Sequence, residues 1–342
     1  MSIDSLLSKW NKEMGGEVFT KGLPRYAYTR VPFTSPRLNY MTFGGLPIGK
    51  LVEFSGENGG GKTTTALDVI ANYQQMPDAR SVLYCDCENT LDTEWAEKLG
   101  VDIDSIYIFK PTSQSAEDIF QKIIEAIETD DIGIVVLDSI GVLVTQQELG
   151  KEMTEKTYGG VSAPLTLFSK KIEMLCQKHR TLFIGINQVR ENLNSPYGGT
   201  TTPGGKGWKH NCAVRLQFRK GEYIDDKGNK VSRGVENPAG NIVYVAQEKN
   251  KTCPSTRKTG FYTLRYLEGI DYIADLIEVA IKYDIVQKSG AWFTLVNTDT
   301  GELMYDGKIQ GQSNLKAFLA DDTNISILQG VERLIENKVE KI

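Results

Sequence analysis

The amino-acid sequence predicts an α/β fold with a mostly parallel central sheet, and three observations lead to this class. Between residues 51 and 188, short apolar runs alternate with segments of helical periodicity. The run "IGIVVLDS", residues Ile132–Ser139, is almost continuously apolar, as in a strand covered on both faces. The glycine-rich stretch "GENGGGKT", residues Gly56–Thr63, stands between an apolar strand and a helix. Strands that alternate with helices build parallel sheets.

The elements can be assigned in chain order. Strands are expected at Leu51–Ser55, Ser81–Cys87, Ser105–Phe109, 132–139 and Thr181–Gln188. Helices are expected from Lys62 to Pro77, in "DTEWAEKLG", in "SAEDIFQKIIEAIET" with its S-x-x-D cap, and over about Val161–Lys178. Strands then dominate, in "CAVRLQFRK", "NIVYVAQEKN" and "GFYTLRYL". A small α+β unit follows, with a helix at Asp271–Tyr283, strands near Trp292–Val296 and Leu303–Tyr305, and two final helices.

The chain is expected to divide into three parts: residues 1–30, 31–267 and 268–342. In the first part, Leu6, Leu7, Trp10 and Met14 fall on one face of a helix, and a Pro- and aromatic-rich arm follows it. Such a helix could be donated to a neighbouring subunit for contact, or it could pack on its own core. The pattern alone leaves both arrangements open.

Charge is unevenly distributed along the 342 residues. The formal net charge is −5, which argues against a general nucleic-acid binder. From Val189 to Arg265, however, there are 14 Lys and Arg against 6 Asp and Glu, whereas from Tyr266 to Ile342 there are 7 against 13. A basic segment before an acidic end suggests an anionic partner for the basic segment, although a solvated charged face would give the same counts.

Composition also indicates where the protein works. The five cysteines form no CxxC pair, which favours reduced thiols in a cytoplasm, and two histidines argue against a multi-histidine metal site. No apolar run reaches the roughly 18 residues that a membrane span requires. The N-terminal segment lacks the pattern of a signal peptide. We therefore expect a cytoplasmic protein with no membrane partner.

The stretch "GENGGGKT" matches the phosphate-binding pattern G-x-x-x-x-G-K-[ST] in its proper strand-to-helix context. Glycines let backbone N–H groups converge on phosphate oxygens, and the helix N-terminus adds favourable partial charge. Lys62 is expected to neutralise the β and γ phosphates of ATP, and the Thr63 hydroxyl to bind Mg²⁺. The residues assigned to nucleotide binding here are Gly56, Glu57, Asn58, Gly59, Gly60, Gly61, Lys62, Thr63 and Thr64.

Acidic and aromatic residues near the strand ends complete a candidate hydrolytic site. Asp138 ends the strand "IVVLD" and is placed to support Mg²⁺. Glu88 follows the strand "VLYCDC" at the edge where α/β folds bind ligands, and it is the candidate general base, with Asp86 as competitor. Trp95 could stack on the adenine, or it could be an ordinary core aromatic.

Gln188 ends a strand directly before a mobile-looking basic stretch that includes "TTTPGGKGWKHN", residues Thr200–Asn211. Gly- and Thr-rich runs are usually connectors. An amide that bonds the γ-phosphate could instead control such a loop, since hydrolysis would release it. In "EKNK", Lys249 and Lys251 point the same way from a strand end and need an anion or solvent.

Together these motifs resemble the RecA family of DNA strand-exchange recombinases, from about Ser35 to Val339. The resemblance is carried by "GGLPIGKLVEFSGENGGGKTT", "DCENTLDTEWAEKLGVDID", "IVVLDSIGVL", "INQVR", "TTTPGGKGWKHNCAVRL", "EKNK" and "KSGAWF". It implies a RecA-like P-loop ATPase core at residues 31–267 and a small C-terminal domain at 268–342. The core would carry two DNA-binding loops, the first at about Glu148–Gly160 and the second at Val189–Lys209. The Gly/Thr run is then a loop that must order itself along a DNA backbone.

The resemblance also implies roles for individual residues. Asp92 and Trp95 match adenine contacts, and Gln188 matches the γ-phosphate sensor. Lys249 and Lys251 match lysines that reach the neighbouring subunit's ATP. The DNA-binding positions it implies are Lys151, Lys156, Arg190, Tyr197, Thr202, Gly204, Gly205, Lys206, Lys209 and Arg215. Pro164 stands where the family pattern has an arginine, and the first loop carries Lys151 and Lys156 instead.

The function that the resemblance implies is ATP-dependent homologous recombination. The chain would form helical homo-oligomeric filaments on single-stranded DNA, pair them with homologous double-stranded DNA and exchange strands, with DNA-stimulated ATP hydrolysis. Two other classes remain open on the sequence: a hexameric helicase-type motor on the same core, and a non-catalytic ATP-gated scaffold.

Overall fold

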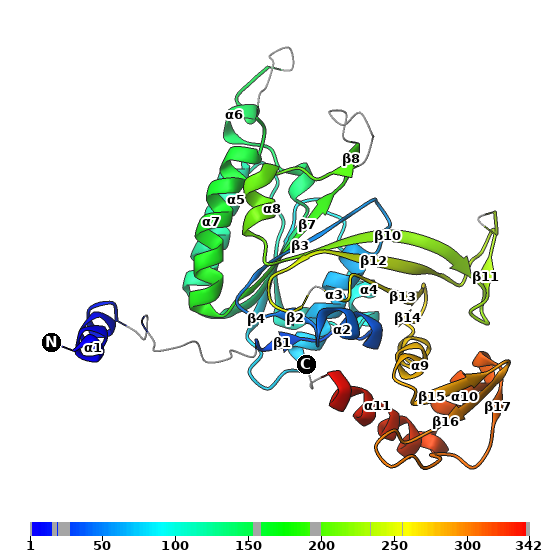
Figure 1. Ribbon diagram of the computed structural model, residues 1–342. Helices are drawn as coiled ribbons and strands as arrows, with labels where there is room; N and C mark the ends of the chain where they lie inside the picture. The colour runs from blue at the N-terminus through cyan, green and yellow to red at the C-terminus, as the bar shows by residue number, and fades with distance from the viewer. Residues whose placement is uncertain are drawn as a thin grey trace.

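A ten-stranded sheet forms the centre of the computed structural model, which describes residues 2–15, 19, 28–152, 159–191, 200–232, 234–254 and 256–339 (Figure 1). Its strands follow the order β14-β13-β12-β10-β3-β7-β6-β4-β5, and β11 pairs with the end of β10. The bounds are β3 (Leu51–Gly56), β4 (Ser81–Asp86), β5 (Ile106–Phe109), β6 (Ile132–Asp138), β7 (Leu182–Gln188), β10 (Val214–Ile224), β11 (Lys230–Val231), β12 (Gly240–Asn250), β13 (Thr259–Arg265) and β14 (Gly269–Ile270).

The sheet has a parallel half and an antiparallel half. From β10 through β3, β7, β6 and β4 to β5, every pairing is parallel. From β10 through β12 and β13 to β14, every pairing is antiparallel. The mostly parallel α/β sheet expected from the sequence is confirmed. The carboxyl ends of β3, β7, β6 and β4 therefore meet at one edge.

Helices cover both faces of this sheet (Figure 1). The apolar run of β6 shows why: Ile134 and Val136 belong to one core cluster, and Val135 and Leu137 to the other. Alternate side chains of a strand point to opposite faces, so an uninterrupted apolar strand needs cover on both. The helices around the sheet are α2 (Pro36–Thr42), α3 (Lys62–Gln74), α4 (Thr93–Lys98), α5 (Ala116–Glu128), α6 (Gln146–Leu149), α7 (Ser162–His179) and α8 (Gly205–Asn211).

Local capping fixes where several helices begin. In α5, Ser115 and Asp118 form the capping box that the sequence predicts, since each side chain accepts a backbone N–H of the other residue. Shorter elements complete the core: the two-stranded pairs β1 (Arg30–Val31) with β2 (Leu46–Pro47) and β8 (Arg190–Glu191) with β9 (Thr200–Thr201), and the 3₁₀ turns η1 (Ile103–Ser105) and η2 (Ile140–Val142).

The C-terminal unit has its own apolar core. It consists of α9 (Tyr272–Lys282), β15 (Val286–Ser289), β16 (Trp292–Leu295), β17 (Ile309–Gln310), α10 (Gln312–Ala320), η3 (Asp322–Asn324) and α11 (Ile325–Val339). The strand expected at residues 303–305 is wrong: Leu303 makes only an isolated bridge to Val296, and β17 is the third strand. Backbone hydrogen bonds from the Asn297 N–H to the Glu302 carbonyl oxygen and from the Met304 N–H to that of Leu295 flank this bridge, but the pairing does not extend into a strand.

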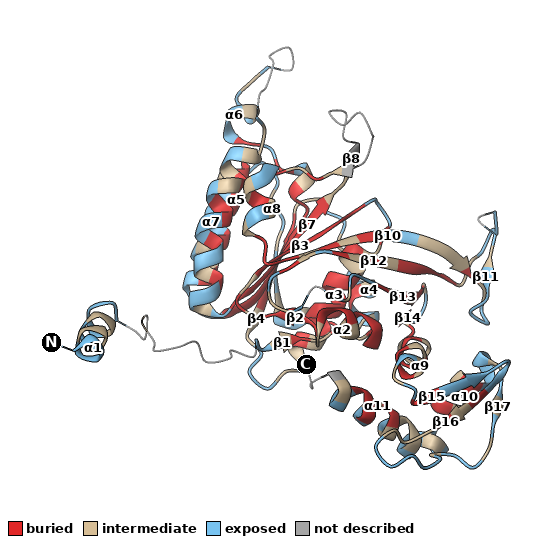
Figure 2. Ribbon diagram, in the orientation of Figure 1, coloured by how far each residue is buried: buried red, intermediate tan, exposed pale blue. Residues whose placement is uncertain are grey.

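The N-terminal helix α1 (Ile3–Glu13) stands apart from the body (Figures 1 and 2). None of its residues is buried. Trp10 contacts Phe19, with ring centroids 5.1 Å apart. An amphipathic helix that buries nothing is unusual, because its apolar side chains stay in water. Among the described residues, no helix is long and apolar enough to cross a membrane.

A buried carboxyl group joins the C-terminal unit to the core. Asp275 of α9 is 1% exposed; the Ser35 hydroxyl donates to its Oδ2 at 2.5 Å, and the Thr263 N–H donates to its Oδ1 at 3.3 Å. Arg37 lies beside it and pairs with Glu278 at 3.1 Å. Burial raises the pKa of Asp275 to about 7 despite the nearby Arg37 charge.

This raised pKa predicts a pH-dependent stability. The folded protein holds the Asp275 proton more tightly than the unfolded chain, so the stabilisation is complete below the ordinary pKa of 3.8 and is lost as pH rises through about 7. Asp275→Asn stays uncharged, so its melting temperature should fall less than that of the wild type between about pH 5 and about pH 8. Asp306→Asn, at an exposed carboxylate, is the matched control. Equal slopes in all three proteins would contradict the assignment.

Candidate functional site

The glycine-rich loop connects β3 to α3 and lies against the antiparallel half of the sheet. Gly61 caps α3 with φ of 93°, a left-handed conformation that favours glycine. A Cβ at this position would lie 2.8 Å from the Tyr262 hydroxyl and 3.1 Å from Val243. The loop is therefore shaped both by its own sequence and by strands β12 and β13, and a side chain would push it out of place.

Lys62 lies at the mouth of this loop and is largely buried. Its ammonium donates to the backbone carbonyl oxygens of Gly56 at 3.0 Å and Glu57 at 2.8 Å. Burial lowers the pKa of Lys62, while the carboxylates of Asp138 and Glu88 act in the opposite direction. A flexible buried ammonium held by two weak carbonyl acceptors is ready to transfer to a stronger anion such as a phosphate.

A hydroxyl and a carboxylate stand beside Lys62. The Thr63 Oγ1 donates to Asp138 Oδ2 at 2.8 Å, and the Tyr84 hydroxyl donates to the same oxygen at 2.8 Å. The pKa of Asp138 is raised above its ordinary value because burial outweighs the opposing effect of these two hydrogen bonds. Mg²⁺ prefers oxygen ligands and usually keeps several waters and substrate phosphates, so one hydroxyl and one carboxylate at the phosphate loop fit a Mg²⁺–nucleotide.

The two candidate general bases differ in their surroundings. Asp86 is 1% exposed, and its oxygens accept the backbone N–H groups of Thr90 and Leu91, each at 3.1 Å. Glu88 instead accepts hydrogen bonds through Oε1 from the Ser139 hydroxyl and, at 3.1 Å, from Gln188 Nε2. Asp86 therefore shapes the turn that carries Glu88, while Glu88 faces the strand edge. This geometry favours Glu88 over Asp86.

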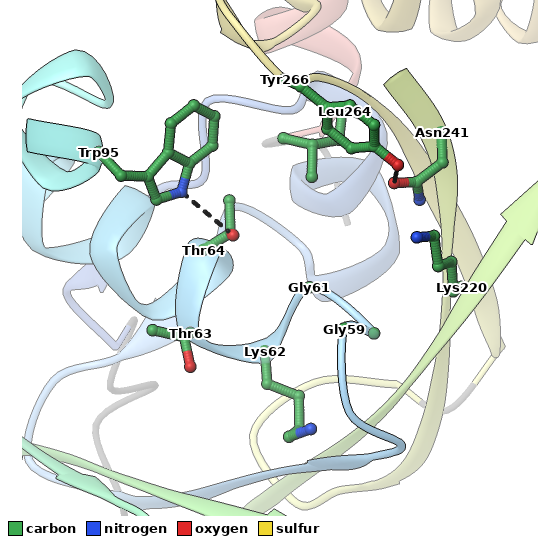
Figure 3. A pocket seen from close by; sticks show the side chains of 11 residues that line it. Gly59, Gly61, Lys62, Thr63, Thr64, Trp95, Lys220, Asn241, Leu264 and Tyr266 are labelled. Atoms are coloured by element: carbon green, nitrogen blue, oxygen red, sulfur yellow. Dashed lines mark hydrogen bonds between the residues drawn. The ribbon is translucent and has the colours of Figure 1, made fainter. Parts of the chain in front are cut away.

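A cavity of about 420 Å³ opens above the phosphate loop. Figure 3 shows Trp95 on one side of it and Leu264, Tyr266 and Asn241 on the other, with the loop beneath. Trp95 Nε1 donates to Thr64 Oγ1 at 3.4 Å, and the Tyr266 hydroxyl donates to Asn241 at 3.0 Å. An aromatic wall with a few polar groups suits a nucleotide base. Asp92 contributes indirectly, since its carboxylate caps α4 and so positions Trp95.

Sequence reasoning missed the far wall of this cavity. Lys220, Asn241, Leu264 and Tyr266 come from β10, β12 and β13 or directly follow it, more than 150 positions beyond the phosphate loop. No local spacing marks them.

The second candidate DNA loop starts directly after Gln188. Its base is a two-stranded pair, in which Arg190 lies opposite Thr201, and it returns through α8. Gly204 begins this helix with φ of 98°, and a Cβ there would lie 2.4 Å from Leu165. Lys206 is exposed, and Lys209 donates to Thr201 at 3.0 Å. The bases of both candidate DNA loops, near α6 and β8, project from the same end of the molecule (Figure 1).

Some expected DNA contacts have other surroundings. Arg215 is bound by Glu53 and Glu248, at 2.5 Å and 2.8 Å, so its guanidinium is already engaged. Thr202 is 7% exposed and therefore lies in the loop base rather than on its surface. Arg190 is exposed and donates to the Gly141 carbonyl oxygen at 3.3 Å. Lys156 and Tyr197 lie outside the described residues.

Lys249 and Lys251 converge on the end of α8. Both ammonium groups donate to the His210 carbonyl oxygen, at 2.7 Å and 3.4 Å, and Lys249 also donates to that of Lys209 at 2.9 Å. Burial, and then the Lys251 charge, lower the pKa of Lys249. Neither lysine lines the described cavity above Lys62. Backbone carbonyl oxygens of their own subunit therefore accept from both ammonium groups, away from this cavity.

The fold and this arrangement define a P-loop nucleoside triphosphatase. Comparison with known proteins agrees: residues 7–271 match the RecA N-terminal domain, and residues 274–340 match the RecA C-terminal domain. The chain is 34% identical to Protein RecA of Ruminococcus albus, covering 87% of this chain and 68% of that protein. It is 33% identical to Protein RecA of Clostridium acetobutylicum, over 87% of this chain and 79% of that protein. It is 31% identical to Protein RecA of Mycoplasma mycoides, over 88% of this chain and 82% of that protein.

The chain belongs to the RecA family. It is a DNA-binding, self-assembling recombinase with DNA-dependent ATPase activity.

The contrast between the two carboxylates gives a prediction. Glu88→Gln should retain ATP and DNA binding but lower the hydrolysis rate by about 10² or more, because only water activation is removed. Asp86→Asn is the matched control: it should lower melting temperature by loosening the turn at residues 87–91, with a smaller effect on turnover per folded protein. Single-turnover ATPase and thermal melting measure both. Near-normal hydrolysis in Glu88→Gln would transfer the base role to another group.

Proposed function

We propose that this protein assembles as a helical filament on single-stranded DNA, pairs the bound strand with homologous double-stranded DNA and exchanges strands in the cytoplasm. One observation carries the proposal. Gln188 donates to Glu88 on the hydrolytic side, and its chain continues directly into the base of the basic loop. An amide that bonds Glu88 in one state and the γ-phosphate in another would make loop geometry depend on the nucleotide.

Within the ATP site, each residue has a separate task. Lys62 moves from its two loop carbonyls to the β and γ phosphates, and Thr63 with Asp138 holds Mg²⁺, which supplies charge neutralisation for the transferred phosphoryl group. Glu88 accepts the proton of the attacking water. Trp95 and Tyr266 enclose the base between them. The described contacts support this division: Lys62 donates to the loop carbonyls, Thr63 donates to Asp138, Gln188 donates to Glu88, and Trp95 and Tyr266 line the cavity.

The DNA loop is proposed to grip the backbone rather than to read bases. Lys206, Lys209, Arg190 and Lys151 supply positive charge, and glycine-rich backbone offers N–H groups to phosphate oxygens. Recombination on arbitrary sequence requires this indifference to base identity. Arg215 takes a supporting role in this proposal, since two carboxylates already hold it.

Subunit contact is proposed at two places. Lys249 and Lys251 act on the ATP of the neighbouring subunit, so each hydrolytic site is complete only at an interface. The unburied apolar face of α1 packs on an adjacent copy, which would remove its leucines and Trp10 from water. DNA then stimulates hydrolysis by aligning subunits.

Salt dependence tests the phosphate grip. Lys206 and Lys209 can each neutralise about one phosphate, so replacing both with Ala should lower the log–log salt slope of DNA binding by about one to two units. Lys122→Ala/Lys171→Ala, on exposed lysines of α5 and α7, is the charge-matched control and should keep the wild-type slope. Fluorescence anisotropy with single strands of several sequences measures this. A marked sequence preference with an unchanged slope would contradict the proposal.

Mixed filaments test the shared ATP site. Lys249→Ala/Lys251→Ala should bind nucleotide through its own Lys62, yet it should not hydrolyse it because the neighbour's lysines are missing. Glu88→Gln should not hydrolyse nucleotide because its own general base is missing. An interface with Glu88 from the lysine variant and lysines from the Glu88→Gln subunit contains a complete site. Mixtures should therefore regain part of the DNA-dependent ATPase that neither variant has alone. Background activity at every mixing ratio would show that the lysines serve their own subunit.

A further inference from the structure

A fully buried carboxylate lies beneath the base of the DNA loop. Glu53 stands in the middle of β3 and is 0% exposed. Its Oε1 accepts hydrogen bonds from Asn187 Nδ2 at 2.9 Å and from the Trp208 indole Nε1 at 2.8 Å. Its Oε2 accepts Arg215 Nε at 2.5 Å. Burial of a charge is costly unless donors surround it, so all three partners are needed together.

Each partner belongs to a different working segment. Asn187 precedes Gln188 on β7, and its Nδ2 also donates to the Pro203 carbonyl oxygen at 3.0 Å. Trp208 is the buried anchor of α8, the helix that carries Lys206 and Lys209. One carboxylate thus touches the strand of the γ-phosphate sensor and the return helix of the DNA loop.

Arg215 extends the same connection to the interface lysines. It lies opposite Lys249 in the β10–β12 register, and its Nη1 pairs with Glu248 at 2.8 Å. We call Glu53, Asn187, Trp208, Arg215 and Glu248 the Glu53 cluster. None of its members lines the cavity above the phosphate loop.

The loop base beside this cluster holds two unsatisfied polar atoms. Asn187 Oδ1 and Thr202 Oγ1 are buried and have no hydrogen-bond partner within the described part of the chain. Buried polar groups without partners are costly, so a second arrangement that pairs them is energetically accessible. Both atoms lie where the chain enters or leaves the DNA loop, which makes this loop base a candidate two-state element.

We propose that Glu53 is a positioning residue that couples DNA binding at residues 189–209 to the nucleotide state, through Asn187 and Gln188 on one side and Arg215, Glu248 and Lys249 on the other. This inference rests on the proposed function. If α8 shifts when the loop binds DNA, Trp208 moves and the hydrogen bonds of Glu53 rearrange. Asn187 on β7 and Arg215 on β10 then change position together, and with them Gln188 and Lys249. A coupling of this kind is a free energy between two sites and can be measured as such.

The test is the ratio of two DNA dissociation constants. Binding of a fluorescein-labelled oligothymidylate strand is measured with adenosine 5′-(γ-thio)triphosphate and with ADP. The wild type should bind DNA much more tightly with the triphosphate. Trp208→Phe removes the indole donor but keeps an aromatic ring, and Glu53→Gln removes the charge but keeps an acceptor. In either variant the ratio should fall to within about twofold of one, with DNA affinity in ADP and nucleotide affinity unchanged.

Controls separate coupling from simple destabilisation. Trp292→Phe makes the same chemical change at a half-exposed site on β16 and should keep the wild-type ratio. Thermal melting shows whether a variant is unfolded. If one of the two variants is unfolded, the ratio of dissociation constants in the other variant tests the proposal. A folded Glu53→Gln or Trp208→Phe with the wild-type ratio, or with both dissociation constants shifted equally, would overturn the Glu53 proposal alone. A wild-type ratio of one would instead overturn the proposed function.

Discussion

The parallel register of β3, β7, β6 and β4 is the constraint on which the whole site depends. In this register Gly56, the first residue of the phosphate loop, lies opposite Gln188, and Asp86 lies opposite Asp138. Because side chains alternate across a sheet, a slip of one residue in any pairing would turn a functional side chain to the other face. Four segments far apart in sequence thus bring the phosphate loop, Asp138, Glu88 and Gln188 to one edge of the sheet.

Buried carboxylates hold the segments around that edge in relation to one another. Asp138 accepts hydroxyls from the phosphate-loop helix and from β4, and Glu53 accepts donors from β7, α8 and β10. Asp275 does the same between the core and the C-terminal unit. An unpaired charge in a dry interior is costly, so each carboxylate constrains every element that supplies its donors. These buried carboxylates therefore set how the neighbouring helices and strands lie relative to one another, as well as contributing to stability.

The antiparallel half of the sheet gives the core its particular chemistry. Strands β10, β12 and β13 form the far wall of the base cavity and press on the phosphate loop at Gly61. Arg215 on β10 and Lys249 on β12 do not line that cavity: two carboxylates hold Arg215, and the His210 carbonyl oxygen accepts from Lys249. This half of the sheet therefore completes the cavity above the subunit's own phosphate loop.

The sequence by itself determined the elements whose signals are local. The phosphate loop, the capping box of α5, the apolar run of β6 and the alternation of strands with helices are each contained within a few adjacent residues. The expectation of a strand at 303–305 was wrong because periodicity does not reveal that its pairing with the end of β16 stops at the single Val296–Leu303 bridge. Only the tertiary structure revealed the far wall of the cavity, the different surroundings of Asp86 and Glu88, and the engagement of Arg215. Those depend on which side chains meet across the sheet and on which charges are desolvated, and both are properties of the packed chain rather than of any one segment.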